Sequence, residues 1–427
     1  MDIKSLYSLF KSHRSVTTDS RNCPPGALFF ALRGDTFDGN RFAAAALEAG
    51  CSYAVVDDPS VVAGNRYILV DNVLQTLQAL ARCHRREWGR TVVGVTGTNG
   101  KTTTKELMAA SLSRRFKVLA TEGNLNNSIG VPLTLLRLDD TCEMAVIEMG
   151  ASHPGDIAEL VDIAEPDFGL ITNVGKAHLQ GFSSFEGVVA TKCELYDFLR
   201  RHGGKVFLHH EDAILSQRAA GLVAAEYGTT PGLSVSGCLT GCSPCLSFSF
   251  TTQGETYAVD TQLIGSYNLP NALAAAAVAA YFGVAPADIA RALSEYEPRN
   301  RRSQLVRTAR NTLIVDAYNA NPTSMGAALD NFLTADFPAK TVILGDMGEL
   351  GADSESEHRR IVEWLGQQPS LDVILVGSEF SKAAGTMTSF ADTDALVEFL
   401  KANPIADRTL LIKGSRFMKL ERCIEYL

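Results

Sequence analysis

The stretch Thr91-Val-Val-Gly-Val-Thr-Gly-Thr-Asn-Gly-Lys-Thr-Thr-Thr-Lys-Glu106 contains the most informative pattern in this 427-residue chain. Its first six residues are mostly β-branched and predict a buried strand, and the residues from Lys101 onward predict a helix. The glycine-rich turn between them lets backbone amides approach an anion, with the N-terminus of the helix behind them. Lys101 adds a positive charge, and the hydroxyl of Thr102 is a suitable ligand for Mg²⁺. The stretch therefore predicts a site for the phosphates of a nucleoside triphosphate.

The stretch departs from the strict phosphate-loop pattern at one position, because Val95 stands where that pattern has its first glycine. The competing interpretation is an ordinary helix that starts after a glycine-rich turn. The strand, the lysine and the threonine all favour nucleotide binding over that interpretation. The predicted contacts are Gly97, Thr98, Asn99, Gly100, Lys101, Thr102 and Thr103.

The composition is that of a soluble globular protein, with 46% hydrophobic and 20% charged residues. At this length we expect about two or three domains. The 39 basic and 48 acidic residues give a formal net charge of −9, which disfavours a general nucleic-acid binder. No apolar run reaches the roughly 18 residues of a membrane helix, and no leader pattern follows Met1. We therefore expect a cytoplasmic protein that does not insert into membranes.

The chain has nine cysteines, an odd number, and most stand singly within apolar segments. Reduced thiols fit that distribution. Cys238, Cys242 and Cys245 are clustered and raise the alternative of a zinc site, but the sequence offers no fourth His or Cys ligand nearby. Buried or loop thiols are the favoured interpretation.

The alternation of strand-like and helical patterns predicts an α/β protein with three domains, at residues 1–85, 86–297 and 298–427. The first is a small α/β unit. The second has a parallel sheet of the phosphate-loop type, to which alternating runs within 229–265 add antiparallel hairpins. The alanine-rich Leu269–Phe282 predicts a core helix in the same unit. Four strand-like runs alternating with helices after Pro298 predict a Rossmann-like third domain.

Several polar residues follow predicted strands, where parallel sheets place their sites. Glu148 ends a strand and suits Mg²⁺ binding, although a solvated glutamate at the rim of the site is the alternative. His178 follows another strand end by a few residues. Taken alone, it is more often a structural histidine, and Lys192 alone predicts a surface lysine on an amphipathic helix.

Three further clusters carry polar or basic groups. Asn268-Leu-Pro-Asn271 opens the alanine-rich helix, where it can cap the helix or contact a base. Arg299, Arg301 and Arg302 suit phosphate binding or, alternatively, a solvated linker. Asp316-Ala-Tyr-Asn-Ala-Asn-Pro322 follows a strand and starts a helix, so turn and capping roles explain it on their own.

Taken together and in this order, these motifs resemble those of the Mur ligase family. The resemblance covers essentially the whole chain. The motifs that carry it are Thr96-Gly-Thr-Asn-Gly-Lys-Thr102, Gly123-Asn-Leu-Asn-Asn-Ser-Ile-Gly-Val-Pro132, Glu148-Met-Gly-Ala-Ser152, Asn173-Val-Gly-Lys-Ala-His178, Asn268-Leu-Pro-Asn271, Asp316-Ala-Tyr-Asn-Ala-Asn-Pro322 and Leu344-Gly-Asp-Met-Gly-Glu-Leu350.

The resemblance implies an ATP-dependent, amide-forming ligase of peptidoglycan synthesis. Three of its motifs are similar to the branch of the family that joins D-alanyl-D-alanine to UDP-N-acetylmuramoyl-tripeptide. In that reaction ATP phosphorylates the peptide carboxylate, and the dipeptide amine attacks the resulting acyl phosphate. The three domains would then bind the UDP-sugar, ATP and the dipeptide, respectively. A monomer is implied as well.

The resemblance also implies roles for individual residues. Lys101 would neutralise the β- and γ-phosphates, and Thr102 and Glu148 would hold one Mg²⁺. His178 and a carbamylated Lys192 would hold a second Mg²⁺. The γ-phosphate arginine matches Arg302, with Arg301 as the alternative. Contacts to the adenosine are assigned to Asn271 and Asp316, those to the UDP-muramoyl-peptide to Ser20, Arg21, Asn124 and Asn127, and those to D-Ala-D-Ala to Asn319, Asn321 and Ser415.

A site divided between two domains implies that the domains close over their substrates, and that the free enzyme can adopt an open form. Two rival functions stay open on sequence alone. One is a sister ligase, such as a folylpolyglutamate synthase or a Mur enzyme for another amino acid. The Asp-Asn-Pro-Arg block of the family's diamino-acid ligases is absent from the sequence. The other rival is a nucleotide-gated switch, which would have no use for His178 and Lys192.

Overall fold

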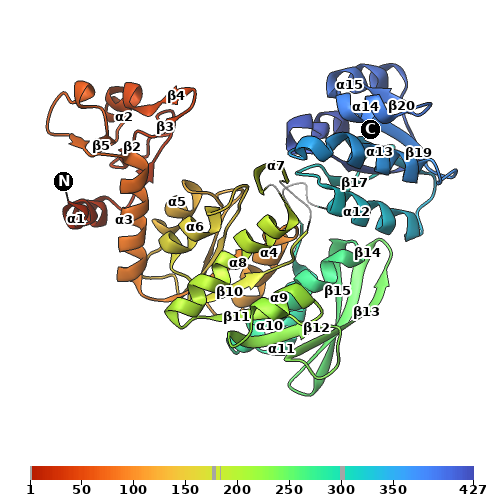
Figure 1. Cartoon of the computed structure of the whole chain (residues 1–427), viewed down its shortest axis with the longest axis horizontal. Helices are drawn as coiled ribbons and strands as arrows, with labels where there is room; N and C mark the ends of the chain where they lie inside the picture. The colour runs from red at the N-terminus through yellow and green to blue at the C-terminus, as the bar shows by residue number, and fades with distance from the viewer. Residues whose placement is uncertain (1, 176–178, 183, 299–302) are drawn as a thin grey trace.

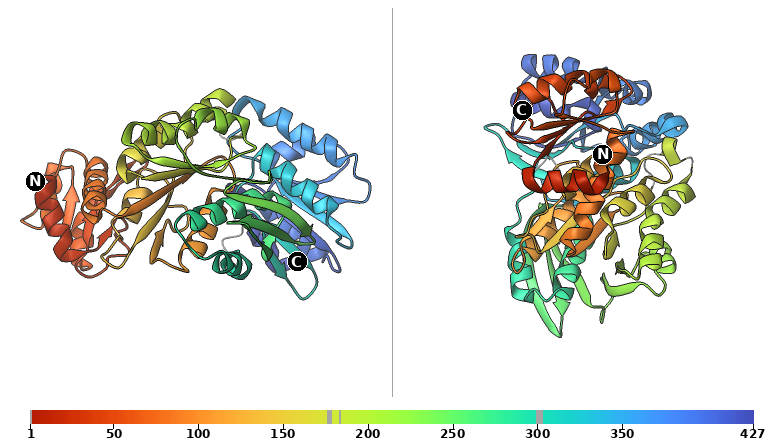
Figure 2. Two further views of the ribbon diagram at one scale, coloured as in Figure 1. Left: turned by 90° about the horizontal axis from the view of Figure 1, so that it is seen from below. Right: turned by 90° about the vertical axis from the view of Figure 1, so that its left-hand side faces the viewer.

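A computed structural model of the chain describes residues 2–175, 179–182, 184–298 and 303–427. Three α/β units follow one another along the chain, and the first and third lie at opposite ends of the second (Figures 1 and 2). Each unit is built on its own main sheet. No helix within the described ranges is both long and apolar enough to cross a membrane.

The N-terminal unit has a four-stranded parallel sheet in the order β1-β2-β5-β6. Its middle strands are almost fully buried, as expected for a parallel sheet covered on both faces. Its strands are β1 (Val16–Thr17), β2 (Leu28–Phe30), β3 (Arg33–Gly34), β4 (Phe37–Asp38), β5 (Tyr53–Val56) and β6 (Tyr67–Leu69), of which β3 and β4 form a separate small hairpin. Its helices are α1 (Ile3–His13), η1 (Gly39–Phe42), α2 (Ala43–Glu48) and η2 (Pro59–Val61).

Helix α3 (Val73–Trp88) joins this unit to the next. It starts at Asn72, whose side chain accepts a hydrogen bond from the Gln75 amide, and it ends at Gly89 in the left-handed region. One face packs on α1, and another packs on α5 (Gly130–Leu135) and α6 (Asp156–Ala164) of the central unit. The helix is therefore shared between two cores.

The central sheet has nine strands in the order β15-β14-β13-β12-β11-β10-β7-β9-β8. The strands from β13 to β8 are parallel, and β13, β14 and β15 form antiparallel pairs that extend the sheet, as predicted. The strands are β7 (Thr91–Thr96), β8 (Val118–Ala120), β9 (Met144–Glu148), β10 (Phe168–Ile171), β11 (Lys205–His209), β12 (Val223–Gly228), β13 (Val235–Cys242), β14 (Cys245–Thr252) and β15 (Glu255–Ile264). The other helices are α4 (Lys101–Leu112), α7 (Leu179–Phe182), α8 (Phe185–His202), α9 (Ala213–Arg218), η3 (Ser266–Asn268), α10 (Leu269–Tyr281) and α11 (Pro286–Glu295).

Helix α10 is the predicted alanine-rich core helix. Its residues from Ala272 to Ala279 are all at most 1% exposed. It packs against α4, the helix that starts at the phosphate loop, and against β12. Because alanine has a small side chain, these two helices can approach closely, so α10 supports the phosphate loop from behind.

The C-terminal unit has a six-stranded sheet in the order β16-β17-β21-β18-β19-β20, in which only β16 is antiparallel to its neighbour. Its strands are β16 (Gln304–Arg307), β17 (Thr312–Asp316), β18 (Lys340–Gly345), β19 (Asp372–Val376), β20 (Thr388–Phe390) and β21 (Thr409–Lys413). Its helices are α12 (Pro322–Thr334), η4 (Gly351–Asp353), α13 (Ser354–Leu365), α14 (Ser378–Ala383), α15 (Thr393–Ala402), η5 (Arg416–Met418) and η6 (Leu420–Tyr426).

The predicted fold class, three α/β units with a central parallel sheet and added hairpins, is confirmed. The residue boundaries at 85/86 and 297/298 stay predictions, and none of the main sheets crosses either of them.

Candidate active site

The predicted phosphate loop connects β7 to α4 through residues 97–100. Gly97 has φ +140°, and a Cβ there would lie 2.0 Å from Thr172 Oγ1. Gly100 has φ +80°, and a Cβ there would lie 2.5 Å from Asn271 Oδ1. Both positions therefore require glycine for conformation and for space. The result is a turn whose backbone is open to an anion at the start of a helix.

Side chains from neighbouring elements hold this loop in place. The amide of Asn99 donates to Asn173 Oδ1 at 3.1 Å, and its carbonyl accepts from Thr172 Oγ1 at 2.6 Å. Behind Gly100, Asn271 accepts from Thr104 Oγ1 at 3.1 Å and donates to Asn268 Oδ1 at 2.9 Å. Asn271 thus has a supporting position beside the loop, at the cavity described below.

The side chain of Lys101 folds back over its own loop. Its Nζ donates to the carbonyl oxygens of Gly97 at 2.8 Å and Thr98 at 3.0 Å. Lys101 also lines the cavity described below, where a bound phosphate would need a counter-charge.

Glu148, at the end of β9, is only 1% exposed. Its Oε1 accepts from Thr102 Oγ1 at 3.1 Å and from Asn126 Nδ2 at 2.8 Å. Its Oε2 has no hydrogen-bond partner among the described residues. A buried carboxylate oxygen without a partner is costly, and a divalent cation is the group that best satisfies it. The Thr102 and Glu148 pair therefore fits the predicted Mg²⁺ site.

Lys192 lies on α8 and is only 2% exposed, so the sequence alternative of a surface lysine is wrong. Its Nζ has the Ala151 carbonyl at 3.5 Å and lies 5.6 Å from the ring centre of Phe182. Burial, and secondarily the charge of Lys101, lowers its pKa to about 7. A large fraction of this amine is therefore uncharged near neutral pH.

The C-terminal unit contributes a carboxylate of a different kind. Asp316, at the end of β17, forms an ion pair with Lys413 at the end of the neighbouring strand β21. Its other oxygen accepts from the Ser303 amide at 3.2 Å. The hydroxyl of Ser303 lies 2.9 Å from that of Tyr267 in the central unit. Asp316 is thus held at the junction of the two units.

These groups surround one cavity of about 650 Å³ between the central and C-terminal units, a volume typical of small-molecule sites. It brings together most of the predicted contacts to ATP and D-Ala-D-Ala. The predicted residues that line it are Thr98, Asn99, Gly100, Lys101, Thr102, Thr103, Asn127, Glu148, Asn271, Asp316, Asn319 and Asn321. Within the described residues, the lining does not include Gly97, Lys192, Ser20, Arg21, Asn124 or Ser415.

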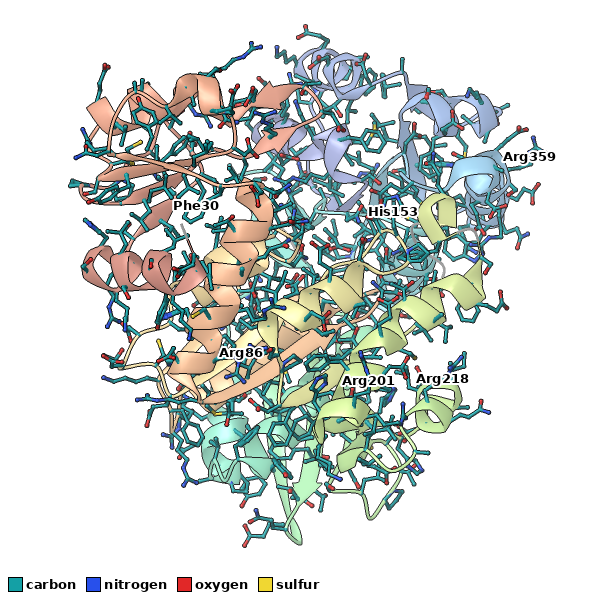
Figure 3. The ribbon with its side chains drawn as sticks, turned by 60° about the vertical axis from the view of Figure 1, so that its left-hand side comes forward. Phe30, Arg86, His153, Arg201, Arg218 and Arg359 are labelled. Atoms are coloured by element: carbon teal, nitrogen blue, oxygen red, sulfur yellow. The ribbon has the colours of Figure 1, made fainter. Side chains whose placement is uncertain are left out.

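Two of the predicted contacts to the UDP-muramoyl-peptide lie in the N-terminal unit, away from the cavity. Arg21 pairs with Asp19 through two bonds of 2.9 Å, and Ser20 lies between them in the same turn. Figure 3 shows the separation, with Phe30 in the N-terminal unit and His153, next to cavity-lining Ser152, in the middle of the molecule. Such a separation suits a substrate long enough to contact both places.

Other predicted contacts have structural partners of their own. Asn127 Oδ1 accepts from the amides of Ile129 and Gly130 at the start of α5, and Asn124 supplies a carbonyl to the amide of Asn126. Asn319 Oδ1 accepts from the amide of Ala320 at 2.9 Å. Ser415 Oγ accepts from the amide of Gly348 at 2.7 Å and is buried beside the carbonyl of Ala320. These positions neither establish nor contradict a substrate role.

His178, Arg301 and Arg302 lie outside the described residues, so their predicted roles are not addressed by the geometry. Within the described ranges no group of three or more His, Cys, Asp or Glu side chains forms a cation site. That includes Cys238, Cys242 and Cys245, which leaves the thiol interpretation for them. Burial raises the pKa of the Cys242 and Cys245 thiols.

Three residues of the site were given no role by the sequence analysis, although Asn126 and Asn173 lie within the motifs that it quoted. Asn126 fixes Glu148, Lys413 neutralises Asp316, and Asn173 secures the loop. A signal for Lys413 exists, because it and Asp316 end strands that turn out to be neighbours in one parallel sheet. Asn126 follows no strand, and its long-range contact has no local signature.

Family models match the chain in three segments that follow its three units. They are described as Mur ligase family, catalytic domain (residues 13–85), Mur ligase middle domain (95–279) and Mur ligase, glutamate ligase domain (301–416). The fold is accordingly that of a ligase. The chain belongs to the Mur ligase family.

Three known proteins illustrate this membership. The UDP-N-acetylmuramoyl-tripeptide–D-alanyl-D-alanine ligase of Bacillus subtilis (strain 168) is 36% identical over 428 residues, which cover 96% of this chain and 92% of the relative. A crystal structure of MurF from Acinetobacter baumannii superimposes with a TM-score of 0.87 at 30% identity, covering 98% of this chain and 97% of that one. The MurF ligase from Thermotoga maritima in complex with ADP gives 0.85 at 28% identity, covering 97% of each chain.

Proposed function

We propose that this protein is an ATP-dependent ligase that joins D-alanyl-D-alanine to UDP-N-acetylmuramoyl-tripeptide, giving UDP-N-acetylmuramoyl-pentapeptide for peptidoglycan synthesis. The observation that carries the proposal is one cavity, lined by the phosphate loop, Glu148 and residues of the C-terminal unit, in which Glu148 has an oxygen without a hydrogen-bond partner among the described residues. The full-length similarity to ligases named for this reaction supports it.

The reaction proceeds in two steps at this cavity. The γ-phosphoryl group of ATP passes to the terminal carboxylate of the tripeptide, which makes an acyl phosphate from a poor acylating agent. The amine of D-Ala-D-Ala then attacks the acyl carbon. A C–N bond forms, the bond to the phosphate oxygen breaks, and the amine loses a proton. Most of the catalysis is positioning and neutralisation of charge.

The protein's own groups supply that neutralisation and positioning. The ammonium of Lys101 would leave its loop carbonyls and bind the β- and γ-phosphates. The glycine-rich turn would cradle them with backbone amides, and Arg302, with Arg301 as the alternative, would contact the γ-phosphate. Asn271 and Asp316 would contact the adenosine from the two sides of the cavity.

The donor set fits Mg²⁺, which would be held by Thr102 Oγ1 and the partnerless oxygen of Glu148. Bound there, the ion supplies positive charge at the phosphates. A second ion would be held by His178 and Lys192. An ammonium cannot be a cation ligand, so Lys192 requires conversion to a carbamate by addition of its uncharged amine to CO₂, with release of a proton. Its lowered pKa, about 7, favours that addition.

The remaining contacts are proposed on resemblance. Ser20 and Arg21 would bind the uridine end, and Asn124 and Asn127 would bind the muramoyl-peptide. Asn319 and Ser415 would bind the dipeptide. The resemblance assigns Asn321 to the dipeptide as well, and a different role for it is argued below. The protein would act as a cytoplasmic monomer whose units close over the substrates and exclude water from the acyl phosphate.

Phosphate release from ATP and Mg²⁺ tests the proposal, with UDP-muramoyl-tripeptide and D-Ala-D-Ala added singly and together. We expect turnover only with both, and a UDP-muramoyl-pentapeptide product by mass spectrometry. Equal phosphate release without either substrate would favour a nucleotide switch. Turnover with a different amino acid in place of the dipeptide would favour a sister ligase.

Carbamylation of Lys192 is tested separately. We expect a carbamate carbon signal when the protein is equilibrated with ¹³C-bicarbonate, and no such signal in Lys192→Met. A small carboxylate such as acetate should restore part of the activity of a Lys192→Ala enzyme, because it places an anionic oxygen in the vacated space. Full activity of Lys192→Met would contradict this role.

A further inference from the structure

Helix α12 of the C-terminal unit touches the central unit at two places along its length. In its last turns, Asn331 Oδ1 accepts from the Ser266 amide at 3.2 Å and from Cys242 Sγ at 3.4 Å. At its start, Asn321 Nδ2 donates to Asn99 Oδ1 at 2.8 Å. Figure 1 shows α12 on the side of the C-terminal unit that faces the central unit. The helix is therefore docked at both ends.

The side-chain amide group of Asn321 has a second partner, which fixes the direction of the group. The side-chain Oδ1 of Asn321 accepts from the backbone amide of Ser324 at 2.8 Å, and the backbone amide of Asn321 donates to Ser324 Oγ at 3.1 Å. These two bonds form a capping box. Because Oδ1 of Asn321 is bonded to the first turn of α12, Nδ2 points away from that turn, toward Asn99. Asn321 is just 8% exposed, so this bond is largely shielded from water.

Asn99 is equally constrained on its side of the contact. Its amide and its carbonyl are bonded to Asn173 and Thr172 in the loop, as described above. A movement of the phosphate loop therefore moves the group to which Asn321 is bonded. Conversely, undocking of α12 frees the side chain of Asn99.

We propose that Asn321 is a positioning residue that ties the first turn of α12 to the phosphate loop, so that docking of the C-terminal unit and the phosphate-binding shape of the loop stabilise each other. This role lies beyond the proposed function, and it replaces a dipeptide contact for Asn321. Coupling of this kind is reciprocal. Loss of one neutral hydrogen bond should therefore weaken nucleotide binding by about two- to twelvefold.

The test uses two variants of the full-length protein. Asn321→Ser keeps a good N-cap residue for α12 but is too short to reach Asn99. Ser324→Ala is the matched control, because it weakens the same capping box and leaves the bond between Asn321 and Asn99 in place. A difference between the two variants reports on the interdomain bond rather than on the helix cap.

Two measurements are made without any turnover. Amide hydrogen exchange is followed in the protein without nucleotide, and the affinity for ADP is measured by titration calorimetry. In Asn321→Ser we expect faster exchange both in residues 97–100 and in the first turn of α12, with ADP binding weakened two- to twelvefold. In Ser324→Ala we expect faster exchange in the first turn of α12 only, with ADP affinity unchanged.

Three outcomes would overturn the proposal. If Asn321→Ser leaves amide exchange at residues 97–100 unchanged, the loop and α12 are not coupled, whether or not exchange in α12 becomes faster. If both variants speed exchange at residues 97–100 equally, the effect comes from general loosening of α12 and not from the bond between Asn321 and Asn99. A raised KM for D-Ala-D-Ala with unchanged ADP affinity returns Asn321 to the dipeptide site. Neither exchange nor ADP binding depends on which amide bond the enzyme makes, so failure of the proposed reaction would leave this test intact.

Discussion

The central and C-terminal walls of the cavity are each built around a buried lysine and a largely buried carboxylate, arranged in opposite ways, with Lys192 lying behind the lining residue Ala151. On the C-terminal wall, Lys413 and Asp316 neutralise each other directly. On the central wall, Glu148 has an oxygen without a partner in the described residues. The amine of Lys192 has the Ala151 carbonyl at 3.5 Å and an aromatic ring beside it, and the carboxylates of Asp156 and Glu194 act on it through their charge without forming an ion pair in the described part of the chain. The C-terminal wall is complete as folded, whereas the central wall has polar groups that await a ligand.

This difference indicates how the protein divides stability from chemistry. A buried ion pair with both partners present is a fixed part of the fold, and breaking it is costly. Buried groups without partners weaken the folded state and are typical of functional sites. Changes on the C-terminal wall should therefore appear first in stability, and changes on the central wall first in turnover.

The largest expected effect is on the stability of the C-terminal wall. Lys413→Met leaves Asp316, whose side chain is only 15% exposed, without its counter-charge, and we expect a loss of about 3–5 kcal/mol in the free energy of unfolding. Lys192→Met should cost little or nothing, because it removes a buried amine that forms no ion pair with any carboxylate of the described residues. Urea denaturation measures both. The double variant Asp316→Asn/Lys413→Met should recover part of the loss, and an equal cost for the two single lysine variants would contradict the comparison.

Glu148→Gln should lower turnover and leave the stability of the protein unchanged, the reverse of Lys413→Met. The amide preserves the shape and a hydrogen-bond acceptor for Thr102, but it removes the negative charge proposed to bind Mg²⁺. We expect turnover to fall by about 10²–10³-fold, with no loss of stability because a partnerless buried charge disappears. Phosphate-release kinetics and urea denaturation of the same preparation decide this. Wild-type turnover in the variant would contradict the proposed metal role.

The pH dependence of stability should also separate the walls. The pKa of Lys192 in the folded protein is about 7, below its ordinary value of 10.5, so the unfolded chain binds more protons between these values. Stability contributed by Lys192 therefore increases as pH rises. Relative to Lys192→Met, the wild type should gain about 2 kcal/mol between pH 7 and pH 9 in CO₂-depleted buffer without Mg²⁺. A flat difference between the two proteins would show that Lys192 titrates normally.

The smallest expected effect concerns Asn126, which orients Glu148 without touching the proposed ion. Asn126→Ala should lower turnover by about tenfold and raise the Mg²⁺ concentration needed for half-maximal activity. Mg²⁺ titration of the phosphate-release rate measures both quantities. Asn127→Ala is a neighbouring control for the Mg²⁺ dependence, since Asn127 Oδ1 accepts from the Gly130 amide and, within the described residues, Asn127 makes no hydrogen bond to Glu148. A variant of Asn126 with unchanged Mg²⁺ dependence would place Glu148 outside the metal site.

The parts of the site that were predictable from the sequence are those built by local chain geometry. The strand, the turn at Gly97 and Gly100 and the helix beyond form one continuous segment, so their pattern is complete in the sequence. The central hairpins and the alanine-rich helix were predictable for the same reason, because alternation and helical composition are local properties. The family motifs made it possible to predict site roles for Glu148 and Asp316 as well.

The partners of these groups were not predictable. Whether Lys192 is buried depends on how α8 packs, and the pairing of Lys413 with Asp316 depends on strand order. Asn126 meets Glu148 across 22 residues of sequence, and Asn321 meets Asn99 across 222. Such contacts are consequences of the tertiary fold, and no single segment encodes them.

The buried alanines of α10 have a consequence for the mutational tolerance of this enzyme. Each added methyl group at positions such as Ala275 or Ala276 has no free volume to enter, because both residues are fully buried. Because α10 packs against α4, a displaced α10 would also shift the first residues of α4, which carry the groups proposed to bind phosphate. Positions that never contact a substrate would therefore rank among the least replaceable in a saturation screen for activity, and the pattern would map a helix rather than a cavity.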